Sequence, residues 1–250
     1  MRLGVNIDHI ATVRNARGVD YPDPSRSIKI IKEAGADGVT AHLREDRRHM
    51  IDSDIEKISR NPFLPLNLEI AATDEMKEIT LKLKPNAVCI VPEKRTERTT
   101  EGGLDVKKNE IYLANFIKSV KKSGCRVSLF IEPEKKQIEI SKIIGADIVE
   151  IHTGSYCNYY IENKYDKTQE SLYKIKEASF YANQIGLEVH AGHGLTYETL
   201  DEIAMIKEIM ELNIGHYLIS EAIFIGIYEA VKNMKNKIKD LRESFDKKVW

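Results

Sequence analysis

The sequence has 250 residues, enough for one large domain, and 42% of them are hydrophobic, which is sufficient for a sizeable core. Lys and Arg number 38 against 39 Asp and Glu, so no basic surplus indicates a nucleic-acid partner. The absence of a membrane-length apolar run, of an apolar leader and of any CxxC pair favours a soluble cytoplasmic protein with neither a disulfide framework nor a structural zinc site.

Eight short runs rich in β-branched residues predict strands. They cover residues 2–8, 38–43, 65–71, 87–92, 126–132, 147–153, 187–191 and 210–215. Amphipathic stretches between them predict helices, among them 23–35, 73–84, 133–145 and a last helix over 222–246. Thr73 is a candidate N-cap, and Gly35 and Gly145 are candidate stop signals. Eight strand–helix units in this length favour a (β/α)8 TIM barrel with extra short helices, one domain over residues 1–250, rather than a doubly wound sheet.

Two polar segments are predicted to be long loops that follow strands. Residues 93–110 carry Gly102 and Gly103 as a candidate hinge, and residues 154–170 carry four tyrosines. Long strand-to-helix loops of a barrel lie above its mouth, so we expect both loops to be functional.

The histidines are distributed unevenly along the chain. All seven fall late in a predicted strand or in the loop directly after it, and none falls in a predicted helix; they are His9, His42, His49, His152, His190, His193 and His216. Because the C-terminal ends of barrel strands converge on one mouth, we expect these residues to form a cluster there. Histidine is the side chain best suited to move protons near neutral pH.

Polar residues also alternate with apolar residues along four predicted strands. The polar faces carry Asn6 and Asp8, then Thr40, His42 and Arg44, then Asn67 and Glu69, then Glu150 and His152. One face of a barrel strand packs under the helices and the other enters the barrel, where polar groups need partners or a ligand. The pattern therefore predicts an active site inside the barrel mouth.

Glu69, with apolar neighbours on both sides, is a candidate general base because burial would raise its pKa. Its alternative role is a structural ion pair with an arginine. His42, His49, Asp8 and His9 could instead bind a metal ion, but HxH and HExxH spacings are absent and nearby arginines would repel a cation. We therefore expect no metal ion at these residues.

Several residues are candidates for binding anions. Arg44, Arg47 and Arg48 follow the second strand and could hold a phosphate or carboxylate, although at least one belongs to a solvated charge run by default. Glycines flank His193, with a helix expected from Thr196, and Gly215 with His216 opens a short helix after the eighth strand. Turns in these positions favour a phosphorylated substrate. Lys94, between Glu93 and Arg95, indicates a solvated side chain rather than a Schiff-base lysine.

Together these motifs closely resemble the pyridoxine 5′-phosphate synthase family. They are GVNIDHIATVRNARG (4–18), HLREDRRH (42–49), NLEIA (67–71), VPEKRTERTTEGGLDV (91–106), EIHTGSY (150–156), AGHGLTY (191–197) and ELNIGH (211–216), and they span nearly the whole chain. The resemblance implies a (β/α)8 barrel that assembles as a homo-octamer, a tetramer of dimers. It implies condensation of 1-deoxy-D-xylulose 5-phosphate with 3-amino-2-oxopropyl phosphate into pyridoxine 5′-phosphate, phosphate and water, without a cofactor.

The resemblance also implies a role for each matching residue. Glu69 and His42 would be acid/base groups, His193 the proton donor and Glu150 a transition-state stabiliser. The aminoketone phosphate would be held by Asn6, Arg17, Gly194, Gly215 and His216. The deoxyxylulose phosphate would be held by Asp8, His9, Arg44, His49 and Thr99, and residues 93–110 would close as a lid. The sequence differs from many relatives in the charged segment 161–170 and at Glu221.

Two other functions stay open from the residues alone. One is a metal-dependent barrel hydrolase, which chelation would inactivate. The other is a non-catalytic barrel that binds sugar phosphates, which would bind its ligand with or without the Glu69 carboxylate. The residues do not decide whether Arg17 acts in its own barrel or in a neighbouring one.

Overall fold

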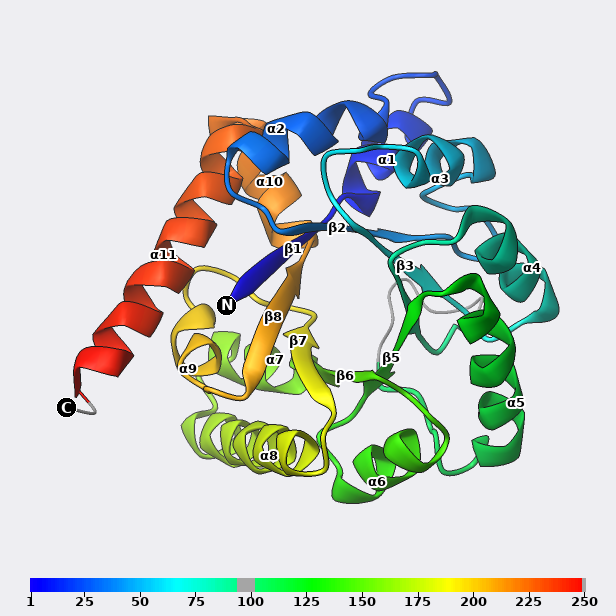
Figure 1. Cartoon of the computed structure of the whole chain (residues 1–250). Coiled ribbons are helices and arrows are strands. Elements are labelled where there is room, and N and C mark those ends of the chain that lie inside the picture. Colours follow the sequence, from blue (N-terminus) through cyan, green and yellow to red (C-terminus); the bar gives the residue numbers. More distant parts are fainter. Residues whose placement is uncertain (94–101, 249–250) are drawn as a thin grey trace.

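The computed structural model describes residues 1–93 and 102–248, and its eight strands close into a barrel in chain order (Figure 1). The strands are β1 (Arg2–Asn6), β2 (Gly38–His42), β3 (Leu66–Ile70), β4 (Ala87–Ile90), β5 (Arg126–Ile131), β6 (Ile148–His152), β7 (Glu188–Gly192) and β8 (Ile209–Ile214). Every neighbouring pair is parallel, including β1 with β8. The predicted TIM barrel is confirmed.

Helices surround the barrel on all sides in Figure 1. They are α1 (Asp8–Asn15), α2 (Ser27–Glu33), α3 (Asp52–Ser59), α4 (Asp74–Leu83), α5 (Glu110–Val120), α6 (Lys135–Ile143), α7 (Gly154–Ile161), α8 (Tyr165–Gln184), α9 (Leu200–Ala204), α10 (His216–Ile225) and α11 (Ile227–Lys248). Two short 3₁₀ helices, η1 (Pro24–Arg26) and η2 (Lys121–Ser123), precede α2 and follow α5. No helix in the described part of the chain has the length and apolarity to cross a bilayer.

Local chemistry explains several helix ends. The Thr73 hydroxyl accepts a hydrogen bond from the Met76 backbone N–H at 3.4 Å, which caps α4 as predicted. Gly35 and Gly145 have φ of 102° and 91° after α2 and α6, in the left-handed region that ends helices and that glycine enters without strain. These three sequence signals are confirmed.

The apolar core lies between the barrel and the helices. Leu3 and Val5 of β1, for example, are fully buried and belong to one continuous apolar cluster with residues of every other strand. The opposite face of the strands points into the barrel and is polar in the four strands for which the alternation predicts it, whereas Cys89, Val91 and Phe130 form a small apolar cluster beside β4 and β5. Polar side chains therefore accumulate along the barrel axis.

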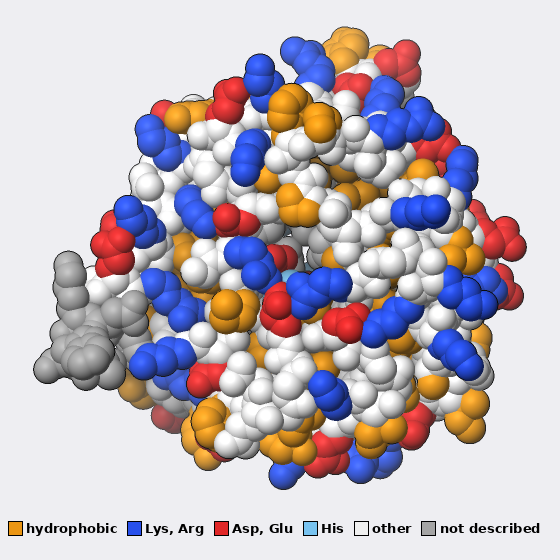
Figure 2. Space-filling view, viewed as in Figure 1, with side chains coloured by type: hydrophobic (Ala, Val, Ile, Leu, Met, Phe, Trp, Pro, Cys, Tyr) orange, Lys and Arg blue, Asp and Glu red, His pale blue; other side chains and the backbone are white. Residues whose placement is uncertain are grey.

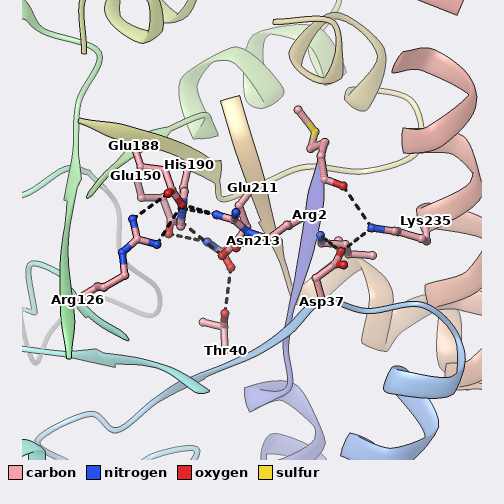
Figure 3. Close-up of polar contacts among 12 residues, drawn as sticks. Arg2, Asp37, Thr40, Arg126, Glu150, Glu188, His190, Glu211, Asn213 and Lys235 are labelled. Carbon is pink, nitrogen blue, oxygen red and sulfur yellow. Dashed lines mark hydrogen bonds and ion pairs between the residues drawn. The ribbon is translucent and has the colours of Figure 1, made fainter. Parts of the chain in front are cut away.

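The N-terminal end of the barrel is closed by ion pairs (Figure 3). Arg2 pairs with Glu188 and Glu211, and Arg126 pairs with Glu188 from the opposite direction. His190 Nε2 lies 2.8 Å from Glu188 Oε1, one step further into the barrel. In the space-filling view, charged side chains likewise gather around the centre of the molecule (Figure 2).

Two predicted elements are wrong. The last helix does not run over 222–246: α10 ends at Ile225 and α11 starts at Ile227, because Gly226 between them has φ of 81°, which no α-helix accommodates. Residues 154–170 are not a long loop, because α7 and the start of α8 occupy them with a turn at Asn163, whose φ is 55°.

Two smaller expectations also fail. No helix starts at Thr196: α9 begins at Leu200, after a turn in which the Thr199 hydroxyl accepts from the Thr196 backbone N–H at 2.8 Å. His9 lies in a helix, since α1 begins directly after its strand, whereas His216 opens α10 after Gly215 as expected. The three cysteines are buried free thiols, as expected without a disulfide framework.

Candidate active site

A cavity of about 580 Å³ opens at the C-terminal ends of the strands. Twelve of the fourteen residues predicted for the site line it: Asn6, Asp8, His9, His42, Arg44, His49, Glu69, Glu150, His193, Gly194, Gly215 and His216. These residues come from almost the whole length of the chain. Five of the seven histidines line this cavity, so the predicted cluster is confirmed for them. His152 lies behind His193, and His190 contacts Glu188 and Glu211 deeper in the barrel, so the prediction is wrong for His190.

The other two predicted residues do not line the cavity. Arg17 is exposed just after α1 and is not among the residues that form the cavity wall. Thr99 lies outside the described residues, as do Lys94 and the central part, 94–101, of the segment predicted to close as a lid.

The first strand and the second strand are tied together at the mouth by Asp8. Its Oδ1 accepts from the His42 backbone N–H at 2.8 Å, and its Oδ2 accepts from Asn6 Nδ2 at 2.9 Å. Asn6 Oδ1 in turn accepts from the Asp8 backbone N–H. Burial raises the pKa of the Asp8 carboxyl, although His42 and these hydrogen bonds act in the opposite direction. Asp8 thus fixes the backbone position of His42, from which the imidazole extends.

Glu69 faces the cavity from β3, directly beside His42 of β2 in the strand register. Its Oε2 lies 3.8 Å from His42 Nδ1. Burial raises the pKa of Glu69 well above its ordinary value, and the carboxylates of Asp8 and Glu150 raise it further. A raised pKa makes the ionised carboxylate a stronger base, which is the property a general base needs. In the described part of the chain, Glu69 contacts His42 rather than forming the structural ion pair with an arginine that was its alternative role.

Glu93 is a site residue that the sequence reasoning missed. Its side chain is 1% exposed and lies 3.5 Å from His42 Nε2 and 3.6 Å from Arg44 Nε. Burial works against its charge, but the hydrogen bond and charge of His42, together with Arg44, lower the pKa of Glu93 overall. His42 is therefore flanked by a carboxyl group of raised pKa, Glu69, and one of lowered pKa. The signal for Glu93 was its position directly after β4.

Three imidazoles gather on the α1 side of the mouth. The ring centroid of His9 lies 4.9 Å from that of His216 and 6.0 Å from that of His49. Burial, with the two neighbouring imidazoles, lowers the pKa of His9 to about 4. Since His9 Nδ1 has no hydrogen-bond partner among the described residues, it is available to a ligand.

His49 is held from behind by α1 and α3. Its Nδ1 lies 2.8 Å from the Thr12 hydroxyl, and its backbone carbonyl accepts from Arg14 and Asn15. Arg14 in turn makes a buried two-pronged ion pair with Asp54, at 2.7 and 2.8 Å. The charged stretch after β2 is thus anchored rather than free in solvent.

The turn after β7 presents His193 to the cavity. His193 has φ of 80°, a left-handed conformation, and its carbonyl lies 2.6 Å from the Thr153 hydroxyl. Its ring is packed edge-on against His152, whose Nδ1 lies 2.8 Å from Glu132 Oε1. Burial and then the neighbouring His152 lower the pKa of His193 to about 4. In the free protein His193 is therefore a neutral imidazole at pH 7.

Glu150 enters the cavity from β6 and is almost fully buried. Burial raises its pKa to about 7. Its Oε2 accepts from Asn213 Nδ2 at 2.8 Å, and Asn213 also lines the cavity although it was not predicted as a site residue. Asn213 could have been predicted from strand alternation, which places it with Glu211 on the face of β8 that points into the barrel.

One group of side chains has the spacing of a metal site. Asp8, His42 and Glu69 each offer an atom that could bind a metal ion, and these atoms lie within 4.8 Å of one another. Both oxygens of Asp8 already accept hydrogen bonds, however, and the positive charge of Arg44 acts on the same carboxylate. The donor set fits a cation only in part.

Comparisons with known proteins point to one family. Residues 3–240 match the model of the family described as pyridoxal phosphate biosynthesis protein PdxJ. A pyridoxine 5′-phosphate synthase of Ruegeria pomeroyi is 55% identical over 242 residues, covering 97% of this chain and 98% of that protein. The protein of the same name from Sulfurihydrogenibium sp. is 54% identical, covering 97% and 100%.

Solved structures show the same fold at low sequence identity. The chain resembles 3-keto-L-gulonate-6-phosphate decarboxylase from Vibrio cholerae with a TM-score of 0.62 at 11% identity, covering 96% of this chain and 98% of that one. It resembles a structure described as native KDPGal with a TM-score of 0.66 at 10% identity, covering 97% of both chains. At these identities the likeness concerns the barrel alone.

Proposed function

Because the chain belongs to the PdxJ family, we propose that it is a pyridoxine 5′-phosphate synthase. It would condense 1-deoxy-D-xylulose 5-phosphate with 3-amino-2-oxopropyl phosphate and release pyridoxine 5′-phosphate, phosphate and water. The observation that carries the proposal is the cavity, which gathers proton-transfer groups and anion-binding groups from six of the eight strand–helix units in one place.

The proton-transfer groups suit a reaction with several protonation steps. Glu69 would act as base, since its raised pKa makes its carboxylate a stronger proton acceptor. His42, next to it, would exchange protons with a second substrate atom while Glu93 supports its positive charge. The amine that forms the imine belongs to the substrate, so no enzyme lysine is required.

His193 would donate a proton to a leaving group. It is neutral in the free protein, so a nearby negative charge must first raise its pKa. A substrate phosphate against Gly194 and His216 would supply that charge. Substrate binding would then prepare the acid, which limits proton donation to the loaded site.

The anion-binding groups form two sets. Arg44, His49 and His9 lie on the side of β1 and β2, and Gly194, Gly215 and His216 follow β7 and β8. Two substrates that each carry a phosphate need two such sets. Both sets border the same cavity, so the two substrates would meet between Glu69 and Glu150.

The decisive assay mixes the purified protein with both phosphates and excess EDTA and follows pyridoxine 5′-phosphate by chromatography. We expect product with EDTA present, and a loss of roughly 10²–10⁴-fold in kcat for Glu69→Gln with little change in KM. Wild-type protein that forms no product with or without added zinc would overturn the synthase.

A metal-dependent hydrolase is a second candidate, favoured by the spacing of Asp8, His42 and Glu69. It predicts phosphate-ester hydrolysis that EDTA abolishes and zinc restores. A sugar-phosphate-binding barrel without activity predicts unchanged ligand affinity and no product in both the wild type and Glu69→Gln.

We also propose a cytoplasmic homo-octamer whose subunits each fold as one domain. Support comes from Arg17, which is exposed close in the chain to the exposed apolar residues Val13, Val19 and Tyr21 and does not line its own cavity. A subunit packed on this surface would take up the apolar area and receive Arg17 as a phosphate ligand. Light scattering measures the number of subunits in the oligomer. Mixing Arg17→Ala subunits with Glu69→Gln subunits tests whether Arg17 serves a neighbouring active site, because activity returns only if one site can combine Arg17 and Glu69 from different subunits.

A further inference from the structure

A short line of buried polar side chains crosses the barrel beneath the cavity (Figure 3). Thr40 of β2 donates through its hydroxyl to Asn213 Oδ1 of β8 at 3.0 Å, and Asn213 Nδ2 donates to Glu150 Oε2 of β6 at 2.8 Å. The three residues are 1%, 6% and 3% exposed. Three strands that are not adjacent are thus connected through side chains alone.

Two glycines make room for this line. A Cβ atom on Gly4 of β1 would lie 2.2 Å from Asn213 Oδ1, and one on Gly192 of β7 would lie 2.5 Å from Glu150 Oε1. Real Cβ atoms do not approach oxygen so closely, so any other residue would displace the amide or the carboxyl group. The strands between Thr40, Asn213 and Glu150 are therefore kept free of side chains where the line passes.

The Asn213 amide lies with its acceptor end toward the Thr40 hydroxyl and its donor end toward Glu150. An amide has a donor end and an acceptor end of nearly the same shape, and only their partners distinguish them. With Thr40 donating to Oδ1, the NH₂ group must face the carboxyl group of Glu150. An N–H donor favours a carboxylate over a carboxylic acid.

We infer that Thr40 and Asn213 are positioning residues that hold the Glu150 carboxyl group directed into the cavity and favour its ionised form. The inference rests on the proposed function, in which Glu150 stabilises a transition state. Condensation of a ketone with an amine passes through cationic imines, and a fixed carboxylate next to them lowers the energy of that charge. Thr40 does not line the cavity and acts only through Asn213.

Other charged and titratable groups also face Glu150. Burial raises the pKa of Glu150 most; His190 of β7 lowers it, Glu211 of β8 raises it, and Asn213 and the Cys89 thiol at 3.9 Å lower it. Glu69 of β3 also interacts with Glu150, since each carboxylate disfavours the charge of the other. Among these groups, Asn213 is the hydrogen-bond donor to Glu150 whose amide is itself held by a second side chain, Thr40.

The test compares Thr40→Val, which keeps the shape and removes the hydroxyl, with Thr40→Ser, which keeps the hydroxyl. We expect Thr40→Val to lower kcat about tenfold at pH 7 and to move the acidic limb of the kcat profile to higher pH. Thr40→Ser should stay within about twofold and keep the wild-type profile. Asn213→Asp, which places a second carboxylate against Glu150, should move the same limb by about one pH unit or more.

Thr80→Val is the matched control, since Thr80 is a buried threonine of α4 whose hydroxyl donates to the Met76 carbonyl at 2.8 Å. It should change stability without moving the pH profile, and circular dichroism reports the folding of every variant. A valine variant of Thr40 that is folded and has the wild-type profile overturns the inference, as does equal behaviour of Thr40→Ser and Thr40→Val. A wild type without product overturns the proposed function and this role of Glu150 with it.

Discussion

Glu150→Gln should make the protein more stable and less active, and the gain in stability should depend on pH. Burial raises the pKa of Glu150 from its ordinary value of 4.5 to about 7. Between these two values the unfolded chain ionises while the folded protein stays protonated, so folding stability falls as pH rises. Above the pKa that Glu150 has in the folded protein, the buried carboxylate is ionised and lowers the free energy of unfolding by the full amount. Glutamine never ionises, so the variant does not lose this stability.

The size of the effect follows from the same two values. At about 1.4 kcal/mol per pKa unit, the difference between 4.5 and about 7 corresponds to about 3 kcal/mol at pH 8 and above. Glu150 is 3% exposed, so solvent screens little of this cost. Glutamine retains an oxygen that can accept from Asn213, so the hydrogen bond at 2.8 Å need not be lost.

Thermal unfolding followed by far-UV circular dichroism measures the difference at two pH values. For a chain of this length about 3 kcal/mol corresponds to a Tm increase of roughly 6–12 °C at pH 8, and the gain should fall below about 0.5 kcal/mol at pH 4.5. Glu177→Gln, on an exposed position of α8, is the control and should stay within about 0.5 kcal/mol of wild type at both pH values. A gain of the same size at both pH values, or a loss at pH 8, would refute the reasoning.

Asp54→Asn should lower the free energy of unfolding by about 3–5 kcal/mol in urea, because it leaves Arg14 buried without its carboxylate partner. It should also raise KM for a substrate phosphate, because Arg14 holds the backbone carbonyl of His49. A loss of stability under about 1 kcal/mol would contradict this. Gly103→Ala should lower the Tm by several degrees, since its Cβ would lie 2.1 Å from the Glu132 backbone nitrogen, while Gly124→Ala, with no atom within 4 Å, reports only the strain of a positive φ. Inorganic phosphate should raise the pKa of His193 from about 4, which NMR titration of the imidazole signals tests; an unchanged value with phosphate bound would argue against the proposed proton donor.

The sequence by itself determines the strands, the barrel and most of the cavity wall. Strand alternation in NLEIA and GVTAHLR assigns Glu69 and His42 to the inner face, because side chains on a strand point alternately to its two sides whatever surrounds them. The closure of eight such strands then places Asn6, Glu150 and His216 at one mouth although they are far apart in the chain. Periodicity and topology suffice for this part of the site.

Other features depend on distances between elements and could not be read from the chain. Polar composition made residues 154–170 resemble a loop, but packing of Tyr156 and Cys157 into the core favours helix α7 there. Glu93 and Asn213 look ordinary in sequence and become site residues only because β4 and β8 bring them against His42 and Glu150. Burial, which sets the charge of Glu69, Glu150 and His193, is likewise a property of the closed barrel and not of any segment. Local sequence thus specifies which side chains enter the barrel, and tertiary packing decides which of them touch and what charge they carry.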